Sequence, residues 1–139
     1  MMGFWNFFFG KPAKPNSADH YFEDQWFFRP NGELISLIVN GQPDSPTQWQ
    51  KDFFAQLEND YSLIVTAIIP DIEDEFQNWK PAFKIVDFER EFKLVHLEIS
   101  TCDQQSIAWE MSFETVHDRN HIVIVGMLGY ELQYMHVYG

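Results

Sequence analysis

Cysteine and positive charge are both scarce in this chain. Cys102 is the single cysteine among 139 residues, so an intrachain disulfide is impossible. Lysine and arginine together number 9 against 21 aspartates and glutamates, which leaves a formal net charge of -12. A surface of that charge repels nucleic-acid phosphates and anionic lipid, and it attracts basic partners. We therefore expect no disulfide framework and no nucleic-acid partner.

Long apolar runs and the common catalytic motifs are missing too. No run approaches the roughly 20 residues of a transmembrane helix, and the chain has neither a glycine-rich phosphate loop nor a G-x-S-x-G elbow. His117 and His121 form a His-x3-His pair, but a structural zinc site needs about four ligands and the sequence nominates no others. A nucleophilic Cys102 would need a base such as His96 beside it. We expect a cytoplasmic protein without catalytic residues, metal or cofactor.

The first 17 residues differ from the rest. Phe4, Trp5 and Phe8 belong to a run with five aromatic residues in six positions, and residues 11–17 are proline-rich, as linkers are. Three interpretations stay open: the segment docks on its own domain, contacts a partner or second copy, or touches a membrane interface through residues 1–10. The negative charge of the remainder argues against the membrane. Residues 18–139 have enough apolar material for a single domain.

That domain begins with a predicted hairpin. Residues 20–28 are aromatic and residues 33–40 are β-branched and apolar on both faces, and Pro30-Asn31-Gly32 between them is a strong turn signal. We expect the second strand to be the more central of the two.

A long helical pattern follows the hairpin. Ser45 is the predicted N-cap, with Pro46 in the first turn. Apolar residues then recur every three or four positions, which predicts helix over roughly 46–69 and 70–78. Because Pro70 interrupts the pattern, we expect two helices or one kinked one, with a further break near Asn59-Asp60.

After residue 81 the apolar period changes to two, which indicates strands. Residues 83–88 suggest a short strand, and residues 92–99, 107–114, 121–127 and 130–138 suggest four more. Without the short strand over residues 83–88, the order is ββ-αα-ββββ, which predicts an α+β fold: an antiparallel sheet with the helices packed on one face.

Two groups of side chains are candidate contact surfaces. The helical region from residue 44 to 79 holds eight acids and only Lys51 as a base, and these acids either solubilise the helices or form a face for a basic partner. The candidate acidic surface comprises Asp52, Glu58, Asp60, Asp71, Glu73, Asp74 and Glu75. The second group is a predicted aromatic stripe along the last strand, either core or interface, comprising Tyr130, Tyr134 and Tyr138.

Several features together resemble a known kind of protein. They are the opening MGFWNFFFGK, a strand-turn-strand before a proline-started helix, the strand WEMSFET at residues 109–115, and a last strand ending in Val137-Tyr138-Gly139. The arrangement resembles small acidic bacterial α+β proteins carried as domains of unknown function, several groups of which look like immunity proteins of toxin systems. The resemblance implies a cytoplasmic, non-enzymatic, protein-binding role and assigns no functional residue.

The sequence thus favours a protein-interaction module, including an immunity-like inhibitor steered onto a basic toxin by its charge. A homo-oligomer assembled through the N-terminal aromatics or the last strand is the first alternative. A small enzyme or ligand-binding protein with a pocket that the sequence does not reveal is the second.

Overall fold

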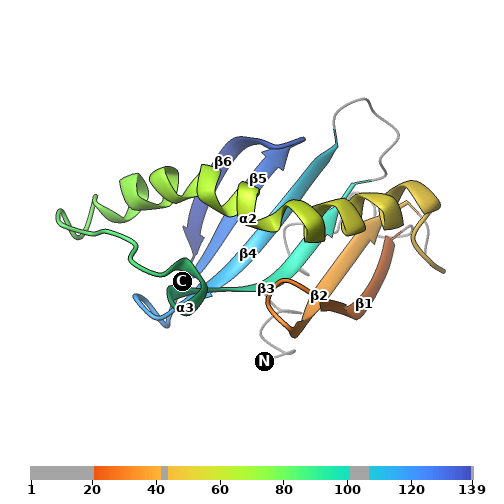
Figure 1. The fold of residues 1–139 in the computed structure, drawn as a ribbon, viewed down its shortest axis with the longest axis horizontal. Coiled ribbons are helices and arrows are strands. Elements are labelled where there is room, and N and C mark those ends of the chain that lie inside the picture. The colour runs from red at the N-terminus through yellow and green to blue at the C-terminus, as the bar shows by residue number, and fades with distance from the viewer. Residues whose placement is uncertain (1–20, 42–43, 101–106, 139) are drawn as a thin grey trace.

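In the described part of the chain, six strands form one open sheet in the order β1-β2-β3-β4-β5-β6, crossed on one face by one long helix (Figure 1). The computed structural model describes residues 21–41, 44–100 and 107–138. The predicted N-terminal segment and Cys102 lie outside these residues. The strands are β1 (Tyr21–Phe28), β2 (Glu33–Asn40), β3 (Phe92–Ile99), β4 (Ala108–Thr115), β5 (Ile122–Leu128) and β6 (Glu131–Tyr138). The α+β class and the helix-on-one-face layout predicted from the sequence are confirmed.

The sheet is antiparallel except at one place. β2 and β3 pair in parallel, with Ser36 opposite His96 and Val39 opposite Ile99. The antiparallel sheet predicted from the sequence holds for the other four strand pairs, and the β2–β3 pair departs from it because one continuous helix, rather than two, connects these strands. A single helix crosses the sheet once, so β3 starts at the end of the sheet where β2 started. The two strands therefore run parallel.

That helix, α2, is continuous over Gln48–Phe76 and contains Pro70. It begins two residues later than predicted, with Thr47 rather than Ser45 as N-cap, and it does not break at residues 59–60. A proline inside a helix costs about 3 kcal/mol. Ile68 and Ile72 on either side of it are 1% and 0% exposed, and burying each of these side chains stabilises the helix by about 1.5–3 kcal/mol. The packing therefore holds the helix together through the proline.

One buried polar side chain fixes the start of α2. Gln50 is 1% exposed, and its Nε2 donates to the carbonyl oxygens of Asn40 at 2.7 Å and Ser100 at 2.8 Å. Its Oε1 accepts from the N–H of Thr47, while the Thr47 hydroxyl accepts from the N–H of Gln50, which completes a capping box. Gln50 thus ties the helix to the chain at the ends of the two parallel strands.

The segment after α2 differs from the predicted strand over residues 83–88. Residues 83–87 form no strand, and Phe88 begins the short helix α3 (Phe88–Glu91), which leads directly into β3. The Phe88 ring stacks on Phe92 at a centroid distance of 5.2 Å. A buried aromatic anchor at each end of the segment, Phe83 and Phe88, takes the place of strand pairing.

The core lies between α2 and the sheet. Along β4, Trp109, Met111 and Phe113 belong to the core below α2 and are nearly fully buried, and Ser112 on the opposite face is buried too. The strand β5 buries six of its seven residues, as its nearly continuous apolar sequence predicts. Among the described helices, none has both the length and the apolar character needed to cross a bilayer.

We expect Gln50→Met to lower the free energy of unfolding by about 2–4 kcal/mol, because it removes two buried donors and half of the capping box. Urea denaturation measures the change. Gln48→Met is the matched control. Gln48 lies two residues before Gln50, is exposed, and donates from its amide to Asp52 at 2.9 Å. Equal stabilities for the two variants would contradict the role given to Gln50.

Candidate functional site

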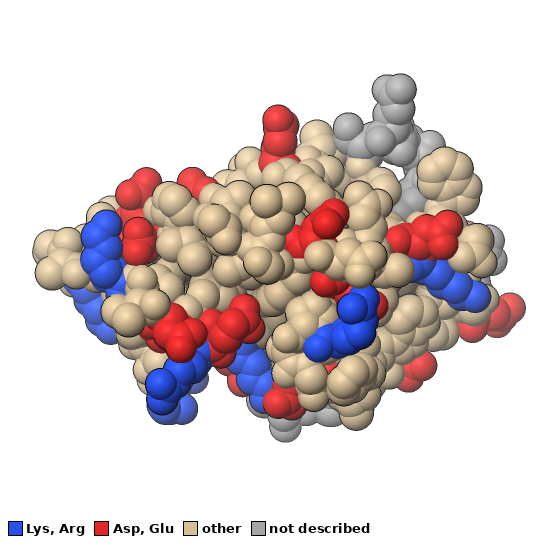
Figure 2. Space-filling model, in the orientation of Figure 1, with Lys and Arg blue, Asp and Glu red and all other residues tan. Residues whose placement is uncertain are grey.

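The outward side of α2 presents one continuous row of exposed residues at spacings of three and four. We call this row the outer stripe of α2; all of its members are exposed, and they are Trp49, Asp52, Gln56, Asn59, Leu63, Ala67, Pro70 and Asp74. Leu63 at its centre is 65% exposed and Trp49 near its start is 72% exposed. Figure 2 shows uncharged atoms over the middle of this face, with carboxylates to either side. An apolar centre within a charged rim is the usual anatomy of a protein-binding surface.

The seven candidate acids do not form one face, because several are bound to other parts of the fold. Glu58 accepts from the backbone N–H of Arg29 at 2.9 Å and also pairs with its guanidinium. Asp60 accepts from the Tyr130 hydroxyl at 2.7 Å. These carboxylates tie α2 to the two edges of the sheet.

At the other end of α2, Glu73 accepts from the N–H of Ile85 at 2.9 Å and pairs with Lys84 at 3.6 Å. Glu75 is half-buried, and Asp52 accepts from Gln48. Asp71 and Asp74 are exposed, and no ion pair or hydrogen bond joins their side chains to the described residues. The carboxylates available to a partner are thus Asp52, Asp71 and Asp74.

The predicted tyrosine stripe is split between the two faces of the sheet. Tyr130 lies in the turn before β6 and packs against the core below α2. Tyr134 lies opposite Gly126 on the other face, where its hydroxyl donates to Glu110. A bulge is the reason: Met127 pairs with Leu132 and Gly126 with Tyr134, which leaves one extra residue in β6. One extra residue moves every later side chain to the opposite face.

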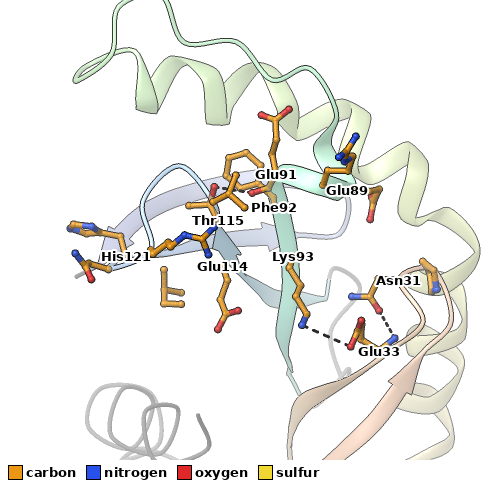
Figure 3. A pocket seen from close by; sticks show the side chains of 15 residues that line it. Asn31, Glu33, Glu89, Glu91, Phe92, Lys93, Glu114, Thr115 and His121 are labelled. Atoms are coloured by element: carbon orange, nitrogen blue, oxygen red, sulfur yellow. Dashed lines mark hydrogen bonds and ion pairs between the residues drawn. The ribbon is translucent and has the colours of Figure 1, made fainter.

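A cleft of about 920 Å³ opens at the end of the sheet where β3 begins and β4 ends. Its walls come from the β1–β2 turn, α3, β3 and the β4–β5 turn (Figure 3). Lys93 and Glu33 point toward one another across it, with 3.9 Å between Nζ and Oε1. The sequence does not indicate this cleft because its walls come from turns that are distant along the chain. The one pattern in those turns, the His-x3-His pair of His117 and His121, does not point to a cleft.

The most constrained side chain beside the cleft is Glu91. Its carboxylate accepts from the N–H groups of Val86 and Asp87 at 2.9 and 2.6 Å and lies 2.7 Å from Nε2 of His117. Burial alone would raise the pKa of Glu91, but the hydrogen bonds from the Asp87 backbone, His117 and the Val86 backbone outweigh it and hold the pKa below its usual range. With its oxygens engaged in this way, Glu91 braces the loop before α3 and is poorly placed to act as a general base.

The two histidines of the predicted polar turn have separate partners. His117 pairs with Glu91 and lies edge-on to the Phe83 ring at a centroid distance of 4.8 Å. His121 lies 2.6 Å from Asp118 through Nδ1. Among the residues that the structure describes, no group of three or more His, Cys, Asp or Glu side chains is arranged to hold a metal ion.

Comparison with protein-family models, with curated proteins and with solved structures finds no match to this chain. The functional interpretation therefore depends on the outer stripe of α2, the cleft and the edges of the sheet.

We expect Glu91→Gln to destabilise the protein at neutral pH. A carboxyl whose pKa is lowered by folding contributes stability above its unfolded pKa, near 4.5, and that stability is lost as the pH falls through the lower folded value. The difference in free energy of unfolding between the native protein and E91Q should be constant from neutral pH to about pH 5. Below pH 5 this difference should fall toward zero. Urea denaturation across this range measures it.

Glu89→Gln is the matched control on the same helix. Burial, with the charge of Asp87 as the second cause, raises the pKa of Glu89. Its carboxylate therefore opposes folding at neutral pH, and E89Q should unfold at equal or higher urea concentration than the native protein. Indistinguishable pH profiles for E91Q and E89Q would show that the hydrogen bonds to Glu91 do not brace this loop.

Proposed function

We propose that this protein is a non-enzymatic protein-interaction module of the bacterial cytoplasm and that a basic protein docks on the outer stripe of α2. The observation that carries the proposal is the exposure of a large apolar side chain, Leu63, at the centre of a surface whose only charged members, Asp52 and Asp74, are acidic. A central apolar anchor within a rim of complementary charge is the arrangement that protein partners bind.

Charge supports a basic partner. The helix α2 carries seven acids and one base, Lys51, and the chain as a whole has a net charge of -12. Complementary charge on a partner raises the association rate and rejects acidic competitors. An immunity-like role, in which the partner is a basic toxin such as a nuclease, fits this charge pattern and the resemblance noted in the sequence.

The dimensions of α2 suit such a contact. A helix of 29 residues is about 43 Å long, and a standard interface buries about 800 Å² on each partner. The sheet holds the inner side of the helix rigid through residues such as Leu57, Ile64 and Phe76, each at most 2% exposed. A partner therefore meets a surface that needs little reordering, which limits the entropic cost of binding.

The cleft at the end of the sheet is a weaker basis for function. Two of its charged residues, Lys93 and Glu91, already have partners within the chain. Residues of both charge signs line it, so no single class of ligand is favoured.

Changing the exposed acids should weaken the complex without affecting the fold. We expect an immobilised full-length chain to capture a stoichiometric basic protein from host lysate at low salt and to release it at high salt. For that captured protein, the double variant Asp52→Asn, Asp74→Asn should raise the Kd about three- to tenfold, mainly through a slower association rate, as measured by surface plasmon resonance.

The control carries the same change in charge elsewhere. Glu23→Gln with Asp24→Asn alters two exposed acids of β1, and it should leave the Kd within about twofold. Equal weakening by the two pairs would mean that net charge alone, and not α2, determines binding. Capture of no stoichiometric partner at low salt would remove the support for the proposal.

Leu63→Ala tests the apolar centre of the same surface. A central anchor typically contributes 1–2 kcal/mol or more, so the Kd of the captured protein should rise about tenfold through faster dissociation. Because Leu63 is 65% exposed in the free chain, its replacement should change the free energy of unfolding by less than about 0.5 kcal/mol. An unchanged dissociation rate would place the contact elsewhere.

A further inference from the structure

The strand β6 forms one edge of the sheet, and no described strand pairs with its outer side. Natural edge strands are commonly protected from pairing with other chains by lysine, proline or an inward-pointing charge. From Leu132 to Tyr138, β6 contains no Asp, Glu, Lys, Arg or Pro. Its one protective feature is the bulge near its start, and the pairing with β5 is regular from Tyr134 to Tyr138.

The opposite edge, β1, is built differently. Glu23 and Asp24 lie in the middle of the strand and are exposed. Asp24 pairs with Leu37 of β2, whose side chain is fully buried in the core below α2, so the Asp24 side chain lies on that same face. A charge at such a position discourages a further strand from adding to this edge. Of the two edges, β6 is therefore the less protected against addition of another strand.

The β6 edge also displays a row of rings on the face away from α2. The centroids of Tyr134 and His136 are 5.2 Å apart, and those of His136 and Tyr138 are 5.6 Å apart. Tyr134 and Tyr138 are 39% and 44% exposed. Tyr134 is held in place because its ring covers Gly126, where a Cβ atom would overlap it, and because its hydroxyl is bonded to Glu110. The Tyr134 ring is thus fixed before a second copy arrives.

We propose that β6 pairs with β6 of a second copy of this chain, antiparallel and about a two-fold axis at His136. This register places Tyr134 of each copy opposite Tyr138 of the other, and cross-strand aromatic pairs stabilise a sheet. A two-fold contact joins identical surfaces, so a chain of net charge -12 can use it only where that surface carries little charge. Among the described strands, β6 is the edge that meets this condition.

Sedimentation equilibrium of the full-length chain tests the proposal. The mass should rise with protein concentration from 16.5 kDa toward twice that value. Salt should strengthen the dimer, because it screens the repulsion between two acidic copies. His136→Glu places two carboxylates opposite one another and should leave a monomer at every concentration. Phe27→Glu is the control, since it adds the same charge to an exposed ring position of β1 and should leave the dimer intact.

A disulfide gives the register directly. In a Cys102→Ser background, His136→Cys should form an intermolecular disulfide on mild oxidation, because residues on the axis lie directly opposite their symmetry mates. A native chain that stays monomeric at high concentration and high salt overturns the proposal, as does a dimer that survives His136→Glu. The result is separable from the proposed function, because binding of a basic partner weakens with salt whereas this dimer strengthens.

Discussion

The packing of α2 across the sheet is the contact on which the rest of this structure depends. Ten helix residues are buried, from Gln50 to Phe76, and each large apolar side chain among them stabilises the fold by about 1.5–3 kcal/mol. That packing carries the helix through Pro70 and, because the helix crosses only once, makes β2 and β3 parallel. It also divides the helix into an inner side that is occupied and an outer side that is available to a partner.

The local sequence pattern predicted most of the helices and strands, but it did not predict their tertiary arrangement. The β-branched apolar run of residues 33–40 located β2, and the alternation of apolar and polar residues located β4 to within one residue. The direction of β3 could not be predicted, since it follows from whether one helix or two connects it to β2. Pro70 pointed to a break because a local rule cannot count the isoleucines buried around it.

The candidate sites show the same limit. One bulge near Gln133 reversed the faces of Tyr134 and Tyr138 relative to Tyr130, and nothing in the alternation of β6 marks that position. The sequence showed that α2 is acidic. It did not show which of its carboxylates bind other parts of the fold and which stay exposed. Glu58 and Glu73 have partners in segments distant along the chain, whereas Asp74 has none among the described residues.

This division gives the acidity of the helix two roles. Some carboxylates hold α2 against the sheet margins, and the others lie exposed along the helix on either side of Leu63. The proposed binding surface is therefore smaller and less acidic than the sequence suggested, with an apolar centre that charge alone did not predict.

Hydroxyl-radical footprinting of the complex captured at low salt tests this account most directly. If the partner binds the outer stripe of α2, oxidation of Leu63 should fall sharply in the complex. Leu34 on β2, similarly exposed at 63%, should be oxidised as fast as in the free chain. Trp109, only 4% exposed, serves as the internal reference for an intact core. Full oxidation of Leu63 in the complex, with protection at Leu34 or along β6 instead, would contradict the claim that the outer stripe of α2 is the binding surface.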